Sequence, residues 1–223
     1  MNIKKILLSA VCILAVAGIS VMGTLAYLTD STAVVNTFTM GNVDIKLDEA
    51  VVDANGVAVT SGERTEVGNQ YKLIPGKTYT KDPTVTVVKG SEESYVRMLV
   101  TFNKLIELDA VFAPTGAELI SIFNGYNDAI WIYAGETEDA AANTITYEFR
   151  YKDAVAAPDE DVKLEALFDT FTVPGEFTAE NLKTLEGFTI TVKGHAIQAE
   201  GFADADAAWA AFVEPTTGNT TNP

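Results

Sequence analysis

Three stretches of this chain alternate apolar and polar residues with a period of two, and no other feature restricts the fold as strongly. They are residues 43–47, 95–102 and 144–151. Successive side chains of a β-strand point to opposite faces, so this period predicts strands with one buried face. The residues expected together on one face are Val96, Met98, Val100 and Phe102 in the second stretch, and Ile145, Tyr147, Phe149 and Tyr151 in the third.

Residues typical of turns separate the strands. Asn55-Gly56 is a strong signal for a hairpin turn, because both residues tolerate a positive φ. Two weaker signals are Ser61-Gly62 and Pro75-Gly76. Further strands are expected where β-branched or alternating residues recur, over residues 84–88, 130–133 and 188–192.

Two interruptions are expected in the second half of the chain. Residues 153–161 are rich in Ala, Pro and acidic residues, which predicts a surface loop. Ile197 falls on the opposite face from Val192 in a regular strand, so we expect a β-bulge at Gly194. The total is about eight strands.

Short helices are expected at three places. Thr115 and Glu118 have the spacing of a capping box, which predicts a helix through Leu119, Ile122 and Phe123 that ends at Asn124-Gly125. Thr178 predicts a second N-cap, with Phe177 and Leu182 at the staple positions and Gly187 at the end. Asp204 predicts a third, with one apolar face formed by Ala205, Ala208, Trp209 and Phe212.

Strand patterns outnumber helical ones, and strands do not alternate with helices as they would in a parallel sheet. The predicted fold class is therefore mainly β, an antiparallel β-sandwich with two or three short helices in the connections. We expect one domain over residues 27–213. Residues 214–223 are Pro-, Thr-, Asn- and Gly-rich, which predicts a disordered tail.

The first 26 residues have the pattern of an export signal. Lys4 and Lys5 precede an apolar run over residues 6–22, and Thr24-Leu25-Ala26 supplies small residues at the exit. We expect cleavage between Ala26 and Tyr27. The alternative is an uncleaved membrane anchor, because the run is near the lower end of the ~17–25 residues that a spanning helix needs.

The charge of the expected mature chain restricts its partners. Residues 1–26 contain two lysines and no acidic residue. Their removal leaves 13 basic and 31 acidic residues, a formal charge of −18. Such a surface repels nucleic acid and anionic membranes, so no nucleic-acid partner is expected. The single cysteine, Cys12, lies in the export signal, so we expect neither a disulfide nor thiol chemistry.

Residues for enzyme chemistry are scarce. His195 is the only histidine, it lies in a strand pattern, and the chain has no His-Glu-x-x-His motif. Catalytic zinc sites usually take three ligands and mostly use two or more histidines. Acidic clusters such as Asp159-Glu160-Asp161 lack the spacing of a calcium loop. We therefore expect no enzyme activity, no catalytic residue, no metal and no cofactor, and we expect Trp131 and Trp209 in the core.

Several motifs resemble the TasA/camelysin family of secreted Gram-positive proteins. At the export junction they are Gly23-Thr24, Ala26-Tyr27, Thr29-Asp30, Asn36-Thr37-Phe38, Gly41 and Asp44-Ile45. Further along they are Pro75-Gly76-Lys77, Pro83, Tyr95-Val96-Arg97, residues 196–202 and Ala208-Trp209. The resemblance implies a jelly-roll-like sandwich, maturation by a SipW-type signal peptidase, and a fibre subunit of an extracellular biofilm matrix. Camelysin-type relatives have been described as metalloproteases.

The resemblance also implies donor-strand exchange between subunits. Residues 27–41 are rich in β-branched and aromatic residues and follow the expected cut. Such a segment can add to an open sheet edge of a neighbour. The expected subunit-interface residues are Tyr27, Leu28, Val34 and Val35, with Gly41 as the hinge. The alternative is that residues 34–47 form the first strand of their own sandwich.

The predicted function is a secreted structural protein of the cell surface or extracellular matrix of a Gram-positive-type bacterium. The expected partners are further copies of the chain in a head-to-tail homopolymer, the SipW-type peptidase during export, and other matrix proteins. One alternative is a monomeric adhesin or ligand-binding module on the same sandwich. The other is a camelysin-like metalloprotease, which the single histidine and the absence of cysteine from residues 27–223 disfavour.

Overall fold

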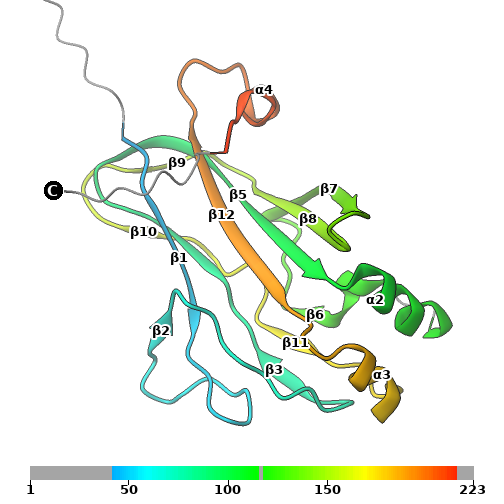
Figure 1. Ribbon diagram of the computed structural model, residues 1–223. Helices are drawn as coiled ribbons and strands as arrows, with labels where there is room; N and C mark the ends of the chain where they lie inside the picture. The colour runs from blue at the N-terminus through cyan, green and yellow to red at the C-terminus, as the bar shows by residue number, and fades with distance from the viewer. Residues whose placement is uncertain (1–41, 116–117, 215–223) are drawn as a thin grey trace, which may run out of the picture. The chain divides into compact units, whose positions relative to one another are not determined.

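A computed structural model describes residues 42–115 and 118–214 of the protein (Figure 1). One layer is an antiparallel sheet with the strand order β12-β5-β8-β7, and β9 continues β8 along the first part of β5. Its strands are β5 (Ser91–Asn103), β7 (Trp131–Asp139), β8 (Thr144–Tyr151), β9 (Val155–Ala157) and β12 (Ile190–Gln198).

The second layer consists of two sheets that continue into each other. Their strand orders are β10-β4-β1-β2 and β3-β11-β6. The chain runs directly from β3 into β4 and from β10 into β11, and a backbone hydrogen bond from Leu167 N to Pro83 O, 3.1 Å, links these two connections. Their strands are β1 (Ile45–Ala50), β2 (Arg64–Thr65), β3 (Thr78–Thr80), β4 (Thr84–Val87), β6 (Phe123–Asn124), β10 (Val162–Lys163) and β11 (Thr170–Thr172).

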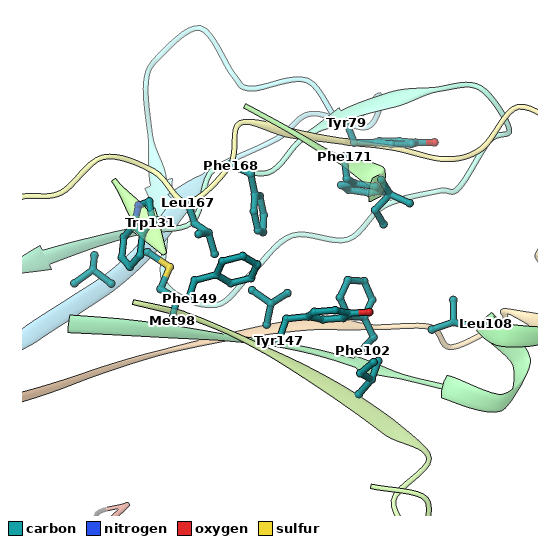
Figure 2. Close-up of a cluster of buried hydrophobic side chains, with 14 of the residues drawn as sticks. Tyr79, Met98, Phe102, Leu108, Trp131, Tyr147, Phe149, Leu167, Phe168 and Phe171 are labelled. Atoms are coloured by element: carbon teal, nitrogen blue, oxygen red, sulfur yellow. The ribbon is translucent and has the colours of Figure 1, made fainter. Parts of the chain in front are cut away.

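The hydrophobic core lies between these layers. The predicted faces of the two long strands are confirmed: the four residues of β5 have no exposed surface, and the first three of β8 are at most 5% exposed. Figure 2 shows Phe149, Tyr147 and Phe102 facing Phe168 and Phe171 of the other layer. Burying each such side chain stabilises the fold by about 1.5–3 kcal/mol. The mainly β class, the antiparallel sheets and the short helices of the predicted sandwich are therefore confirmed.

Trp131 lies in the core between the layers, as predicted, whereas Trp209 is buried outside that core, in helix α4. Trp131 has no exposed surface and its indole N–H donates to the backbone oxygen of Glu165 at 3.0 Å. Tyr151, at the end of the predicted face of β8, is partly buried and packs edge-on against Trp131. Trp209 is 6% exposed.

The predicted turns form where expected. Val52 and Ala58 pair across the Asn55-Gly56 turn, where Gly56 has a φ of 71°. Gly62 and Gly76 also have positive φ, and Lys77 N donates to Ile74 O across the Pro75-Gly76 turn. The glycines permit a backbone conformation that other residues rarely adopt.

Two of the three predicted helices form with their predicted caps. In α3 (Ala179–Thr184) the Thr178 hydroxyl accepts from the backbone N–H of Asn181 at 3.2 Å, and Gly187 follows the helix with a φ of 78°. In α4 (Ala205–Ala211) the Asp204 carboxylate accepts from the N–H of Ala207 at 2.8 Å. The buried residues of α4 are Ala208 and Trp209, on the predicted face.

The third predicted helix is wrong. Thr115 ends a 3-10 turn, η1 (Ala113–Thr115), and Glu118 makes no side-chain cap. Only a second 3-10 turn, η2 (Leu119–Ile122), forms there, and Phe123–Asn124 pair with β11 as strand β6. Pairing with a strand distant in sequence prevails over the local helical signal, because it supplies hydrogen-bond partners for the backbone and stacks Phe123 on Phe168.

The helix of this region lies earlier, at α2 (Leu105–Phe112), which the sequence does not signal. Its N-cap residue, Lys104, makes no side-chain cap. The missing hydrogen-bond acceptors come from Asn143, whose backbone oxygen accepts from Leu105 N and whose side-chain oxygen accepts from Ile106 N at 2.9 Å. A cap supplied from 37 residues away leaves no local pattern.

Two expectations for the second half of the chain are also wrong. The predicted loop at 153–161 contains β9, in which Ala157 has no exposed surface. No bulge occurs at Gly194, since β12 pairs with β5 without a shift from Ile190 to Gln198. A Cβ at Gly194 would lie 3.2 Å from Val85 Cγ2, so glycine allows the two layers to approach there.

The strands are more numerous than the predicted eight. Twelve form within the described residues, and the additional ones are mostly two or three residues long. The strand expected at 130–133 continues to Asp139 as β7. None of the helices between residues 42 and 214 has the length and apolar character required to cross a bilayer.

A candidate strand-acceptor site beside strand β12

Strand β12 forms an edge of its sheet. Its nine residues pair with β5 along their whole length, and no strand within residues 42–115 and 118–214 pairs with the other side. It contains one residue with a permanent charge, Lys193, and neither proline nor bulge interrupts it. A long regular edge of this kind presents free N–H and C=O groups that can pair with another strand.

The opposite edge of the same sheet differs. In β7 the pairing with β8 shifts between Tyr133 and Gly135, and the strand carries three acidic residues, Glu136, Glu138 and Asp139. Bulges and charges are the features by which proteins discourage strand addition at an edge. Of the two edges, β12 is the better template for an incoming strand.

Strand β1 lies beside β12 on the same side of the sandwich (Figure 1). Residues 45–48 pair with β4 on one side, and only Glu49 and Ala50 pair with β2 on the other. The side chains of Ile45 and Leu47 are half-buried and point toward Gly194 of β12. The first half of β1 therefore presents a second unpaired edge within the described residues.

Two adjoining pockets lie beside the start of β12, and we call them together the β12 cleft. The smaller lies between β12 and β1, and the larger between β12, the segment 67–73 and α3. Their volumes are about 820 and 270 Å³, and both are lined by Glu49, Lys81 and the first residues of β12, Ile190 and Thr191. Apolar side chains line the larger pocket: Tyr71, Leu73, Phe171, Leu182, Leu185 and Phe188. The cleft thus combines backbone groups for pairing with apolar surface for side chains.

Charged side chains support the wall of the cleft. Lys81 Nζ lies 2.6 Å from Glu49 Oε2, and Arg64 contacts both Asp48 and Asp82. Burial raises the pKa of the Tyr71 hydroxyl, and the Glu49 carboxylate raises it further. The ion pairs hold β1, β2 and the residues between β3 and β4 together.

The predicted cleavage and interface residues lie outside the described residues. They are Thr24, Ala26, Tyr27, Leu28, Val34, Val35 and Gly41. The first described residue, Asn42, accepts a backbone hydrogen bond from Glu92, and the Asp44 N–H donates to the Ser91 hydroxyl. Residues 45–47 belong to β1 of their own sandwich, as the alternative interpretation expected for that part of residues 34–47.

A third pocket, the aromatic pocket, lies between α2, η2 and the strands β7 and β8. Its volume is about 790 Å³, and its aromatic lining comprises Phe112, Phe123, Tyr126, Tyr133, Tyr147, Phe149 and Phe168. Its other lining residues include four acids, Asp109, Glu118, Glu136 and Glu138. Burial raises the pKa of the Tyr147 hydroxyl, and the nearby carboxylates add to the rise. The sequence does not indicate this pocket, because its residues come from many separate elements.

His195 lies in β12, at the sheet position that its pattern predicts. Its Nδ1 accepts from Arg97 Nε at 3.3 Å, and its ring stacks on Phe212 with centroids 4.8 Å apart. Burial lowers the pKa of the imidazole, and the Arg97 charge lowers it further. In the parts of the chain that the structure describes, no three His, Cys, Asp or Glu side chains converge as metal ligands.

No protein-family model, no curated protein and no solved structure matches this chain. The features that indicate a function are therefore the sequence motifs and the geometry of the β12 cleft and the aromatic pocket.

Proposed function

We propose that the protein is a secreted structural subunit that assembles head to tail into a fibre, as a TasA-like component of an extracellular matrix. In this proposal an N-terminal segment of one subunit adds to the edge of β12 in the next. The observation that carries the proposal is the regular nine-residue edge of β12 with an open cleft beside it. The export pattern of residues 1–26 supports the extracellular location.

The proposed donor segment, residues 27–35, suits this acceptor in length and composition. It has nine residues, as β12 has, and it includes the β-branched residues Thr29, Thr32, Val34 and Val35. In an extended strand Leu28 and Val34 share one face, so both can enter the apolar cleft. Backbone hydrogen bonds would then supply affinity, and the alternate side chains would set the register.

The contact joins two different surfaces of the subunit, so it need not close into a ring. Such a heterologous contact repeats into an open filament. Cleavage at Ala26 would free the donor, because before the cut the export signal holds it at the membrane. Residues 36–41, which end at Gly41, would link the donor to β1.

Deleting residues 27–35 tests the donor. We expect the shortened protein to fold and to remain monomeric, because it keeps β1 and the core but has no strand to donate. Electron microscopy and analytical ultracentrifugation measure the outcome. Filaments of wild-type appearance from the shortened protein would contradict donor-strand exchange.

A substitution in the cleft tests the acceptor. Thr191 is exposed and lines both pockets, so Thr191→Arg should block strand addition without disturbing the core. The matched control is Thr137→Arg, which is also an exposed position, on the β7 edge of the same sheet. We expect filaments from the control and none from Thr191→Arg. Equal assembly of both variants would locate the acceptor elsewhere.

The aromatic pocket supports a second candidate function, a ligand-binding module. Its volume of about 790 Å³ falls within the range of about 300–1,000 Å³ that is typical of small-molecule sites. Aromatic walls with four acids suit an apolar ligand that carries a positive charge. Titration with an aromatic ammonium compound, followed by tyrosine fluorescence, tests this function, and Tyr133→Ala should abolish the response. A response that Tyr133→Ala leaves unchanged would exclude this pocket.

A further inference from the structure

An amine, a carboxylate and a carboxamide meet at the base of the β12 cleft. Lys81 Nζ lies 2.6 Å from Glu49 Oε2, and Asn69 Nδ2 donates to Glu49 Oε1 at 2.9 Å. One carboxylate therefore contacts both the amine and the carboxamide. The side chains of Lys81 and Glu49 are only 7% and 8% exposed, so the group is nearly shielded from water.

Backbone contacts orient the Asn69 carboxamide. Its Oδ1 accepts from the backbone N–H of Val52 at 3.1 Å, and its Nδ2 also donates to the Ala50 oxygen at 2.8 Å. The backbone N–H of Asn69 donates to Glu49 Oε1 at 3.0 Å. Because the Val52 N–H requires an acceptor, the amide nitrogen is the atom that faces Glu49.

The contact between Lys81 and Glu49 places a proton acceptor directly beside the amine. An amine that has given a proton to such a base is a nucleophile. The carbonyl carbon of Asn69 is the neighbouring electrophile.

We propose that Lys81 and Asn69 join in an intramolecular amide bond, with Glu49 carrying the proton. Lys81 Nζ attacks Cγ of Asn69, and the new C–N bond forms as charge develops on Oδ1. The Val52 N–H stabilises that charge as an oxyanion-hole donor does. Glu49 takes the proton released by Nζ and gives it to Nδ2, and the Cγ–Nδ2 bond breaks.

The step balances without any other reactant. An amine and a primary amide become a secondary amide and one molecule of ammonia, and nothing is oxidised or reduced. Nζ must shift from Oε2 toward Cγ, a movement that the flexible four-carbon stem of lysine allows. The reaction happens once in each chain, so it is a self-modification of the folded protein rather than turnover.

The bond would connect the segment after β2 with the residue that follows β3. That segment, residues 67–73, forms a wall of the β12 cleft. A covalent link restricts the unfolded chain and so stabilises the folded one. The modification does not depend on fibre formation, and its test is independent of the assembly experiments.

Peptide mapping of the purified full chain by mass spectrometry tests the proposal. Trypsin should leave residues 65–72 joined to residues 78–89, because an amidated Lys81 is no longer cleaved. The joined pair should weigh less than the two peptides together by the mass of one ammonia molecule. Separate peptides with a free Lys81 would overturn the proposal, as would loss of water through a Lys81–Glu49 link.

Variants separate the reacting groups from the proton carrier. Asn69→Ala and Lys81→Met each remove a reacting group, and Glu49→Ala leaves both in place; all three should lose the link. Lys46→Met, at an exposed lysine of β1, is the control and should keep it. Circular dichroism establishes which variants fold. A linked pair in a folded Glu49→Ala variant would refute the role of Glu49.

Discussion

Two glycines show at the residue scale how close contacts determine this fold. Gly56 combines a φ of 71° with a position under the ring of Tyr79, where a Cβ would lie 2.2 Å from Cδ1. Gly194 has no such positive φ, but a Cβ there would press on Val85 of the opposite layer. The first glycine is required by its backbone and its neighbour, and the second by its neighbour alone.

Gly56→Ala should destabilise the protein strongly. The left-handed backbone conformation costs an L-residue roughly 1–2 kcal/mol, and the contact with Tyr79 adds to this. Gly62→Ala is the matched control, since Gly62 has the same φ of 71° and no atom within 4 Å of the added Cβ. Urea unfolding measures both free energies of unfolding. Equal losses in the two variants would show that the Tyr79 contact has no effect.

At the scale of elements, distant residues complete the short helices. Asn143 caps α2 across the sheet, and its Nδ2 also donates to Glu107 Oε2 at 2.8 Å. On the other face of the same sheet, α4 packs by placing Trp209 and Phe212 over the Arg97 guanidinium, with centroids at 4.5 and 4.8 Å. Each helix is too short to be stable alone, so these contacts decide whether it forms.

Asn143→Ala should loosen the start of α2. Losing a capping acceptor typically costs about 1 kcal/mol. Hydrogen exchange at the Ile106 amide should rise, because that N–H donates to the lost side chain. Asn143→Asp keeps the acceptor and should retain the protection at Ile106. If Ile106 exchanges at the wild-type rate in Asn143→Ala, the cap does not hold the helix.

The contact between α4 and β12 should weaken in acid. Burial and the Arg97 charge lower the pKa of His195 below its ordinary value of about 6.5 in the folded state. The neutral form is thus favoured by folding, so this contribution to stability is complete above about pH 6.5 and is lost as the pH falls through the lowered pKa. Lys193 adds to the lowering, whereas Glu214 and Glu148 oppose it.

His195→Gln, which does not titrate, isolates this effect. Urea unfolding at neutral and mildly acidic pH should show a larger loss of stability for the wild type than for the variant. Both proteins contain the same carboxylates, so the contribution of these groups to the pH dependence of stability cancels in the comparison. A parallel decline in the two proteins would assign the acid sensitivity to other groups.

At the scale of the whole molecule, net charge opposes assembly. The full sequence has a formal charge of −16, and the expected mature chain one of −18. Identical subunits therefore repel each other at neutral pH. Acidification toward the isoelectric point of about 4.3, or added salt, should promote self-association by neutralising or screening the carboxylates. Light scattering measures this, and a signal that neither pH nor salt changes would contradict it.

Export of the whole chain should depend on the small residue at the predicted cut. Ala26→Asp places a charge where the peptidase reads a small side chain, so we expect the precursor to accumulate. Ala33→Asp makes the same change beyond the cut and should mature normally, with Tyr27 first. N-terminal sequencing of the exported protein checks both variants. An exported protein that keeps Met1 would support the membrane-anchor alternative.

The sequence by itself determined the elements whose signals are local. Alternation in β5 and β8 predicts both the strands and their buried faces, because side-chain direction has a period of two. The caps of α3 and α4 were also predictable, because Thr178 and Asp204 bond to residues only three positions away. The turn at Gly56 was predictable because glycine permits the positive φ that the turn requires.

Only the tertiary structure decided the features that join distant parts of the chain. Strand β6 forms where the sequence predicts a helix, Asn143 caps α2 from a distant part of the chain, and β9 lies within the predicted loop. The clefts and the Glu49, Asn69 and Lys81 group combine residues that share no sequence pattern. The physical reason is that a local pattern records what a residue does to its own backbone, whereas pairing and burial depend on which partner the fold brings near.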